Sequence, residues 1–324
     1  MQAGKKWLIT GGAGYIGAHI ANEFLNDGKD IVVFDNLQHG LKARINYLEK
    51  KHNKQIPLAI GDIRSVDSLS KTLSVEKFDG IIHTAALKSV AESFIKPNEY
   101  FEVNTVGTEN IINIAEKLGI KQLIFSSTAA VFSPQRGNQS LNEKSNTEPS
   151  SPYGMSKLLA EKVVDEFLIK DGHHGTSLRF FNVIGCSCTE LADQSKDNLI
   201  PITLSKILNK LPPEIYGNDY DTHDGTCVRD FIDVRDVARA HLLAAKAKIR
   251  LPSVMNVGTG HGMSVQEVIN LVAEVIINQK VHPVIKERRQ GDIPSVYADV
   301  ALIKEKIGFE SKYSILQSIE SLKQ

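Results

Sequence analysis

Two residues four positions apart, Tyr153 and Lys157, have the side chains of a proton-transfer pair. They lie in the segment SPYGMSK, residues 151–157, which offers Ser151 as a helix N-cap and a proline in the first helical turn. The spacing of four puts both side chains on one face of that helix. A phenol with an ordinary pKa of ~10 is a weak base at neutral pH, but a neighbouring ammonium favours the phenolate and lowers that pKa. The pair therefore predicts acid–base chemistry.

A hydroxyl at the end of an apolar run gives this pair a third member. Gln122–Ser126 is predicted as a strand, and Thr128 follows it, at the carboxyl edge where open α/β sheets bind ligands. There the hydroxyl would hold an alcohol beside Tyr153 during hydride transfer. Tyr-x-x-x-Lys alone usually marks a solvated helix face, so the catalytic interpretation depends on Thr128.

A glycine-rich turn near the N-terminus is typical of a dinucleotide site. The segment TGGAGYIG, residues 10–17, satisfies G-x-G-x-x-G through Gly12, Gly14 and Gly17, and G-x-x-G-x-x-G through Gly11, Gly14 and Gly17. Glycines are needed because a side chain would keep the backbone away from a pyrophosphate on the helix N-terminus. A plain tight turn is the alternative for an isolated match.

Carboxylates at the ends of the next two predicted strands support the dinucleotide interpretation. Asp35 ends the second strand, where it would accept hydrogen bonds from ribose hydroxyls. No Arg stands beside it to meet a 2′-phosphate, which favours NAD over NADP. Asp62 and Ile63 follow the third strand, within reach of the adenine. Taken alone, Asp62 is typical of a cap for the next helix.

Strands and helices alternate in the first half of the chain, which predicts βαβ units and a doubly wound parallel sheet of Rossmann type. After residue 181 the rhythm loosens, and the turn-rich segment 183–225 suits a smaller, loop-rich lobe. A helix is expected over Asp236–Lys246 and another over Val265–Ile277. The predicted strands are Trp7–Thr10, Ile31–Asp35, Pro57–Gly61, Gly80–Thr84, Gln122–Ser126, Ser177–Phe181, Val228–Val234 and Val254–Val257.

Composition argues against several functional classes. The 324 residues are 42% hydrophobic and 23% charged, as in ordinary globular proteins. Lys plus Arg and Asp plus Glu number 38 each, so no excess of positive charge favours nucleic-acid binding. No apolar run has the length of a membrane helix, and the first residues lack a signal-peptide core. We expect a soluble, cytoplasmic protein that binds neither nucleic acid nor membrane.

The cysteines and paired histidines do not predict a metal site. The three cysteines, Cys186, Cys188 and Cys227, are too few for a disulfide framework. Neither Cys186-x-Cys188 nor His173-His174 has further ligands at metal-binding spacing. We therefore expect no metal.

In chain order, the motifs resemble those of the UDP-glucose (UDP-galactose) 4-epimerases, within the extended short-chain dehydrogenases/reductases. The resemblance covers nearly the whole chain. The block YGNDY…DGTCVRD is the most specific, because other extended members lack it. The matching motifs are TGGAGYIG, FDNL, GDIR, HTAALKSVAES, EVNTVGT, FSST, SPYGMSK, LRFFNVIG, YGNDYDTHDGTCVRDFIDV, NVGTG and RRQGDIPSVYAD.

The resemblance implies a tightly held NAD, reduced transiently by the substrate, and a UDP-sugar as that substrate. It makes Tyr153 the base at the sugar 4-hydroxyl, Thr128 its hydrogen-bond partner and Lys157 the contact to the nicotinamide ribose. The positive nicotinamide would further lower the pKa of Tyr153. The expected cofactor site contains Gly11, Gly14, Tyr15, Ile16, Gly17, Asp35, Asn36, Asp62, Ile63, Ala85, Ala86, Lys88, Asn104, Ser126, Tyr153, Lys157 and Phe181.

The same resemblance places the nucleotide-sugar contacts mainly in the second lobe. Two guanidinium forks suit a diphosphate with two negative charges. The implied contacts are diphosphate or sugar oxygens for Asn182 and Asn198, diphosphate for Arg229 and Arg289, uracil for Tyr216 and Asn218, and the uridine ribose for Asp292; Lys88, Thr128, Tyr153, Leu199 and Val296 complete the expected site.

The domain organisation follows from the same comparison. We expect an NAD-binding domain over residues 1–181 and a nucleotide-sugar lobe over 182–324, with the segment from about 228 to 258 returning to the main sheet. The family also implies a homodimer through a helical bundle. The candidate helices are Asn98–Leu118 and Tyr153–Lys170, whose outer apolar residues would otherwise be exposed.

The sequence departs from the family pattern in two places. Phe132-Ser133 replaces the usual Tyr-Gly, which removes a hydroxyl and predicts a different local turn near the sugar. Val296 stands where many members that act only on unmodified hexoses carry Tyr, so an N-acetyl group at C2 of the sugar has room there. The substrate range is left open between plain and N-acetylated UDP-hexoses.

Other functions remain as alternatives. A 4,6-dehydratase or a uronate epimerase or decarboxylase belongs to the same superfamily, but dehydratases carry an acidic pair where this chain has Ala129 and Ala130. A catalytically silent NAD sensor is the alternative from another class, and the intact Thr128, Tyr153 and Lys157 argue against it. The pathway, galactose metabolism or polysaccharide supply, is not decided by the residues.

Overall fold

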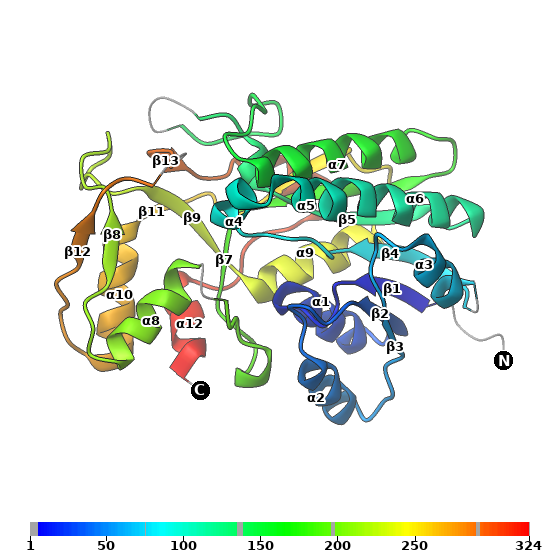
Figure 1. The fold of residues 1–324 in the computed structure, drawn as a ribbon, viewed down its shortest axis with the longest axis horizontal. Coiled ribbons are helices and arrows are strands. Elements are labelled where there is room, and N and C mark those ends of the chain that lie inside the picture. The colour runs from blue at the N-terminus through cyan, green and yellow to red at the C-terminus, as the bar shows by residue number, and fades with distance from the viewer. Residues whose placement is uncertain (1–5, 75, 135–138, 196–197, 290–291, 324) are drawn as a thin grey trace.

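The main sheet is parallel and lies at the centre of the larger lobe (Figure 1). The computed structural model describes residues 6–74, 76–134, 139–195, 198–289 and 292–323. Within these residues the sheet has seven strands: β1 (Lys6–Thr10), β2 (Ile31–Asp35), β3 (Leu58–Ile60), β4 (Phe78–His83), β5 (Gln122–Thr128), β6 (His174–Phe180) and β10 (Val254–Val257). Their order is β10-β6-β5-β4-β1-β2-β3, so the winding reverses between β1 and β4, where such sheets bind ligands.

Helices cover both faces of this sheet, and the strands are buried accordingly. Every residue of β2 and β5 is buried, as expected for parallel strands covered on both sides. One hydrophobic cluster joins the sheet to α1 (Tyr15–Asn26), α2 (Lys42–His52) and α9 (Val234–Lys246). The other joins it to α3 (Val66–Leu73), α6 (Gly107–Lys117) and α7 (Pro152–Leu168). The predicted doubly wound α/β fold is confirmed.

The second lobe is built around a short strand, β9 (Val228–Asp233). It pairs with β7 (Asn182–Ile184) and β13 (Ser295–Val296) in parallel and with β11 (Gly262–Ser264) in antiparallel register. A separate pair, β8 (Glu214–Tyr216) and β12 (Val284–Lys286), lies beside it in Figure 1. The remaining helices are α4 (Val90–Ile95), α5 (Pro97–Phe101), α8 (Leu199–Leu208), α10 (Val265–Ile277), α11 (Ala301–Ile307) and α12 (Ile315–Glu320), with shorter turns η1 (Glu102–Val106), η2 (Ala129–Val131), η3 (Thr189–Leu191) and η4 (Ser321–Lys323).

The segment expected to return to the main sheet does so only in its later part. Strand β10 pairs with β6, and α9 packs against α1, but β9 belongs to the second sheet. The turn-rich segment 183–225 also contains α8, a helix not predicted there; its proline, Pro201, lies in the first turn, where a missing N–H costs little. The domain boundary at residue 181 stays a prediction.

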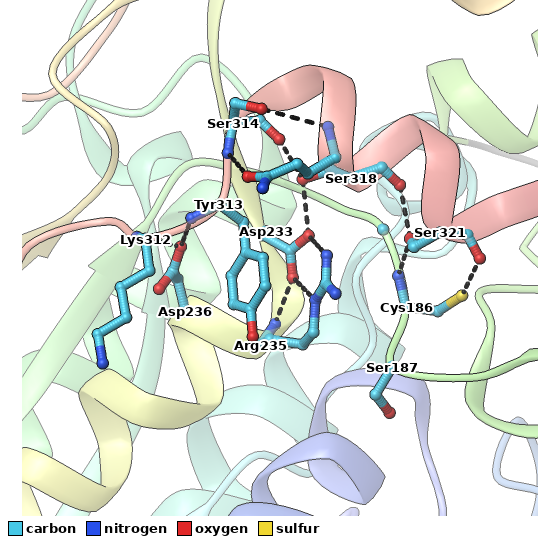
Figure 2. Close-up of polar contacts among 12 residues, drawn as sticks. Cys186, Ser187, Asp233, Arg235, Asp236, Lys312, Tyr313, Ser314, Ser318 and Ser321 are labelled. Carbon is cyan, nitrogen blue, oxygen red and sulfur yellow. Dashed lines mark hydrogen bonds and ion pairs between the residues drawn. The ribbon is translucent and has the colours of Figure 1, made fainter. Parts of the chain in front are cut away.

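The last helix, α12, ties the second lobe to the loop that follows β7 (Figure 2). Ser318 Oγ donates to Asp233 Oδ2 over 2.6 Å, and the backbone N–H of Cys186 donates to Ser321 Oγ over 2.9 Å. On its other side this loop contacts α1, because Tyr15 Oη donates to the carbonyl of Gly185. One loop thus connects α12 to the helix of the glycine-rich turn.

None of the helices within the described residues combines the length and the apolar character needed to cross a membrane.

Candidate active site

The start of α7 brings Tyr153 to the carboxyl end of β5. Ser151 is the N-cap, and its Oγ accepts from the N–H of Gly154 over 3.1 Å. A Cβ on Gly154 would collide with the carbonyl oxygen of Ala130, so glycine here allows α7 to approach the turn after Thr128. The Tyr153 hydroxyl is hydrogen-bonded to Thr128, the last residue of β5. The structure therefore joins the two hydroxyls that the sequence predicted to act together.

Lys157 is buried one turn further along α7. Its side chain is almost fully covered, and Nζ lies 4.0 Å from the centre of the Phe125 ring. Burial lowers the pKa of Lys157 to about 7, and the charge of Glu161 opposes this. The charge of Lys157 therefore changes near neutral pH.

The pKa of Tyr153 does not shift in the protein alone as the sequence argument expected. Burial raises it, because the phenolate is the charged form, and only the hydrogen bond from Thr128 lowers it. The predicted lowering is therefore wrong for the protein without its cofactor. Within the described residues, the chain itself places no positive charge that lowers the pKa of Tyr153, and an oxidised nicotinamide would supply one.

The glycine-rich turn has the shape of a phosphate cradle. Gly11 has a φ of +68°, and a Cβ there would lie 2.7 Å from the backbone nitrogen of Ala85. A Cβ on Gly17 would collide with the carbonyl oxygen of Gly11. Helix α1 begins after Gly14 with no side-chain cap and no acidic residue in its first turn, which leaves its N–H groups available to an anion. The predicted Tyr15 and Ile16 are the first two residues of this helix.

Asp35 lies beside the cradle as predicted. Its carboxylate accepts from the backbone N–H groups of Ala13 over 3.0 Å and Leu37 over 2.8 Å. The expectation that no Arg approaches it is wrong, since the charge of Arg44 acts on Asp35. However, each Nη of Arg44 donates to a backbone carbonyl, of Ala13 and of Ala192. The residues present fit the pyrophosphate and ribose of NAD.

The predicted adenine side contains Asn36, Asp62 and Ile63. Asn36 and Asp62 are hydrogen-bonded to each other, and Arg64 forms a bidentate ion pair with Asp62, with Nη2 to Oδ2 at 2.7 Å. Ile63 is buried. The alternative that Asp62 caps the next helix is wrong, because the N-cap of α3 is Ser65, whose Oγ accepts from the N–H of Ser68.

Asn104 is held inside an irregular turn. It lies in the π-helical turn η1 between α5 and α6, where its Nδ2 donates to the carbonyl of Leu87 and to Ser156 Oγ, each over 3.0 Å. Its Oδ1 accepts from the N–H of Leu87 over 2.8 Å. Asn104 therefore fixes the segment after β4, which contains the predicted Ala85, Ala86 and Lys88, against α7.

Two other predicted cofactor residues contact protein groups. The hydroxyl of Ser126 is bonded to His241 Nε2 of α9 over 2.8 Å. Phe181 is buried after β6, with its ring 6.4 Å from that of Phe132.

The predicted nucleotide-sugar residues form local groups in the second lobe. Arg229 on β9 donates to the carbonyl of Ile293 over 2.7 Å and reaches Asp292 Oδ1 at 3.4 Å. The guanidinium of Arg289 lies 3.9 Å from the centre of the Tyr216 ring. Asn218 is exposed two residues beyond Tyr216. Gln290 and Gly291 of the motif RRQGDIPSV lie outside the described residues.

A third group joins the two lobes through a residue that the sequence did not predict. The carboxylate of Asp193 accepts from Asn198 Nδ2 over 2.6 Å, and Lys88 Nζ lies 3.8 Å from the same oxygen. Asn198 is the N-cap residue of α8, yet its side chain does not cap the helix. Leu199 begins α8, and Asn182 is exposed at the start of β7.

The two departures from the family pattern lie together. Phe132 and Phe181 belong to one small buried cluster, and Val296 packs against it. Ser133 is buried without a positive φ, so its backbone has no need of glycine, and its N–H donates to the carbonyl of Asn146. Val296 pairs in register with Arg229, and so lies between the predicted nicotinamide and diphosphate contacts.

This fold and this glycine cradle define a Rossmann-type dinucleotide-binding protein. The chain belongs to the NAD dependent epimerase/dehydratase family, whose model matches residues 7–258. Family, fold and NAD as the cofactor are thus as predicted.

Relatives match the chain over nearly its full length. It is 35% identical to the UDP-glucose 4-epimerase of Azospirillum brasilense over 98% of this chain and 90% of that protein. The UDP-glucose 4-epimerase of Bifidobacterium longum, solved with NAD⁺ and UDP, superposes with a TM-score of 0.92 at 32% identity, covering 98% of this chain and 97% of that one. The UDP-Glc/GlcNAc 4-epimerase of Campylobacter jejuni has a TM-score of 0.86 at 35% identity, covering 99% and 98%.

Proposed function

We propose that the chain is an NAD-dependent 4-epimerase of UDP-hexoses, an isomerase that interconverts UDP-glucose and UDP-galactose through a transient 4-keto sugar. Relatives at about a third identity over nearly the whole chain are UDP-glucose 4-epimerases, which confirms the predicted activity. The observation that supports the residue roles is the hydrogen bond between Tyr153 and Thr128 beside the buried Lys157.

Each of these three side chains has one task in the proposed reaction. The glycine-rich turn and Asp35 would hold NAD, which would supply the acceptance and return of hydride at C4 of the sugar. Tyr153 accepts the proton of the 4-hydroxyl and later gives it back, while Thr128 holds the same oxygen in position. Lys157, when protonated, would donate a hydrogen bond to the nicotinamide ribose, the contact that the resemblance implies. Arg229, with Arg289, retains the diphosphate while the hexose turns over.

Substitution of the two hydroxyls tests this division of roles. Tyr153→Phe is expected to lower kcat for UDP-glucose by roughly 10²–10⁴-fold, because it removes the proton transfer, while UDP-sugar binding persists. Thr128→Val is expected to lose less, since only positioning is removed. Product analysis by chromatography measures both, and a larger loss in Thr128→Val would contradict the assignment.

We further infer that N-acetylated UDP-hexoses are substrates. Val296 is partly buried and packs against the cluster of Phe132 and Phe181. Because the residue is a valine, no aromatic ring extends from this position. The C. jejuni relative is a UDP-Glc/GlcNAc 4-epimerase by its description. Added bulk in a closed pocket excludes a larger substrate sterically, and its absence admits one.

Val296→Tyr separates the two substrate classes. The wild type is expected to turn over both UDP-glucose and UDP-N-acetylglucosamine, and the variant to lose the N-acetyl activity selectively. The ratio of kcat/KM for the two sugars is the measurement. A wild type inert toward the N-acetyl sugar, or an unchanged ratio in the variant, would refute the inference.

We propose a homodimer through the surface formed by α4 to α7. Exposed apolar side chains occur there on several elements: Phe94, Ile95, Val106, Leu118, Met155 and Ile169. The expected helix Asn98–Leu118 is interrupted by η1 but keeps its direction through α5 and α6 (Figure 1). Light scattering of the purified protein tests this proposal, and a monomer at micromolar concentration would exclude it.

The compartment and pathway are also proposals. Cys186, Cys188 and Cys227 are free thiols, which suits a reducing cytoplasm. A role in galactose metabolism is tested by whether this chain restores growth on galactose to a strain that lacks its own 4-epimerase.

A further inference from the structure

A buried ion pair lies one turn of α7 beyond the proposed catalytic lysine, Lys157. Arg179 of β6 binds Glu161 of α7 in a bidentate manner, with Nε to Oε1 at 2.9 Å and Nη2 to Oε2 at 2.6 Å. Their side chains are only 6% and 5% exposed. Ser127 Oγ also donates to Glu161 Oε1. Burial removes both charges from water, and the bidentate geometry together with the Ser127 hydrogen bond offsets this desolvation cost.

The pair lies next to neighbours of three parts of the proposed active site: Lys157, Thr128 and the Phe181 ring. Glu161 is four residues after Lys157, on the same face of α7. Ser127 precedes Thr128 in β5. The Arg179 guanidinium lies 4.9 Å from the centre of the Phe132 ring, which in turn lies beside Phe181. Arg179 and Glu161 do not themselves belong to the proposed substrate or cofactor contacts.

The charges around Lys157 make this position sensitive to the pair. On α7, the Glu161 carboxylate raises the pKa of Lys157, and Tyr153 is uncharged at neutral pH because burial raises its pKa. On β4, burial lowers the pKa of His83 to about 3, so that ring is neutral. Asn104, on η1 against α7, carries no charge. Arg179 on β6 therefore supplies the positive charge that balances Glu161.

We propose that Arg179 and Glu161 are positioning residues of the epimerase, which hold α7 against β5 and β6 and set the pH range over which Lys157 remains protonated. The proposal rests on the proposed function, since it assumes that the ammonium form of Lys157 is required. Activity then falls at high pH as Lys157 loses its proton. The balance of the two buried charges sets the pH of this fall, which is the alkaline limb of the kcat profile.

Single-charge variants test the proposal because their effects have opposite signs. Glu161→Gln leaves the positive charge of Arg179 unbalanced, and so is expected to move the alkaline limb of the kcat profile for UDP-glucose to lower pH. Arg179→Gln leaves the carboxylate of Glu161 unbalanced, and is expected to move the limb to higher pH. Each shift is expected to be on the order of one pH unit. A merely structural role would lower kcat in both variants without moving the limb in opposite directions.

A second measurement does not depend on turnover. In protein labelled with ¹³C-lysine, the ε-carbon resonance absent from Lys157→Met reports the titration of Lys157, and it is expected to shift in the same two directions. Equal titration in wild type and both variants overturns the proposal. If the wild type does not epimerise UDP-glucose, the proposed function fails, whereas the NMR titration still decides the electrostatic role.

Two further variants guard against loss of folding. The double variant Glu161→Gln/Arg179→Met removes both charges, so it is expected to fold and to restore the limb to near its wild-type pH. The matched control is Arg235→Gln, which breaks the bidentate Arg235–Asp233 pair of Figure 2. It is expected to lower the Tm without moving the limb, and a limb shift as large as that of Glu161→Gln would overturn the proposal.

Discussion

Burial determines the chemistry of several polar side chains in the proposed site. At Lys157 it brings the pKa to about 7, while at Tyr153 it raises the pKa above the ordinary value. Both shifts have the same cause, because each disfavours the charged form. Because their ordinary pKa values are nearly equal, the two groups move apart in proton affinity, and without the cofactor the phenol keeps its proton at pH values where Lys157 has lost its own.

Asp193 is a residue of the proposed site that the structure reveals and the sequence did not predict. It holds Lys88 and Asn198, two donors that we propose for the substrate, and so competes with an anionic diphosphate for them. Asp193→Asn is expected to lower the Kd for UDP by about threefold, the modest size expected of a pair that is partly open to solvent. Calorimetric titration with UDP measures it.

Lys88→Gln is the matched comparison for Asp193. It removes a donor instead of a competitor, so UDP binding is expected to weaken. Weaker binding in Asp193→Asn as well would show that the carboxylate holds the site together rather than competing for it.

At the scale of elements, the π-helical turn η1 is what places Asn104 in the interior. A π-helical turn contains one residue more than an α-helical turn, and such turns frequently mark functional sites. Here the turn directs Asn104 onto Leu87 and Ser156, so that the segment after β4 and α7 keep a fixed distance. Thr105, the next residue, donates to the carbonyl of Ser156 over 2.9 Å.

Asn104→Ala is expected to destabilise the protein measurably. The substitution leaves the buried N–H and carbonyl of Leu87 without their partner, at a cost of about 2–3 kcal/mol in the free energy of unfolding. Urea denaturation measures this change. Asn110→Ala on α6 is the control, since its amide also donates to backbone carbonyls but on a more open surface, and it is expected to cost less than about 1 kcal/mol. Equal losses would contradict the importance of η1.

The elements predicted from sequence are those with a strong local pattern. Strands β2 and β10 and helix α10 occur within the expected bounds, because each is a short apolar run or an amphipathic run between clear caps. Helix α8 and turn η1 were not predicted, since neither has a local pattern that distinguishes it from a loop or from a continuous helix. Arg44 approaches Asp35 only through tertiary packing, which no spacing in the sequence reveals.

In the proposed site, too, residues within motifs could be predicted, whereas residues brought together by the fold could not. Motif residues such as Tyr153 and Thr128 lie together as predicted. Glu161 could have been found from its position four residues after Lys157, but its partner Arg179 comes from another strand. Asp193 lies in a segment without any motif, so only the folded chain places it beside Lys88.

At the scale of the whole molecule, three histidines within the described part of the chain are buried in the neutral form. Burial lowers the pKa of His83 to about 3 and of His19 and His241 to about 4. All three accept or donate hydrogen bonds inside the larger lobe, as His83 does with Thr10 and Thr108. In the unfolded chain their pKa returns to ~6.5, so the unfolded state binds more protons between about pH 6.5 and 4.

We therefore expect the protein to lose stability on acidification through this range. The contribution of these groups is fully present above pH 6.5 and declines as pH falls, by up to about 4 kcal/mol per pH unit for three protons. Urea denaturation at a series of pH values from 7 to 5 measures the slope. His241→Gln is expected to reduce the slope by about one proton, whereas His261→Gln, whose ring is exposed in both states, leaves it unchanged. A slope that His241→Gln does not alter would mean that carboxyl groups, not the buried histidines, cause the acid sensitivity.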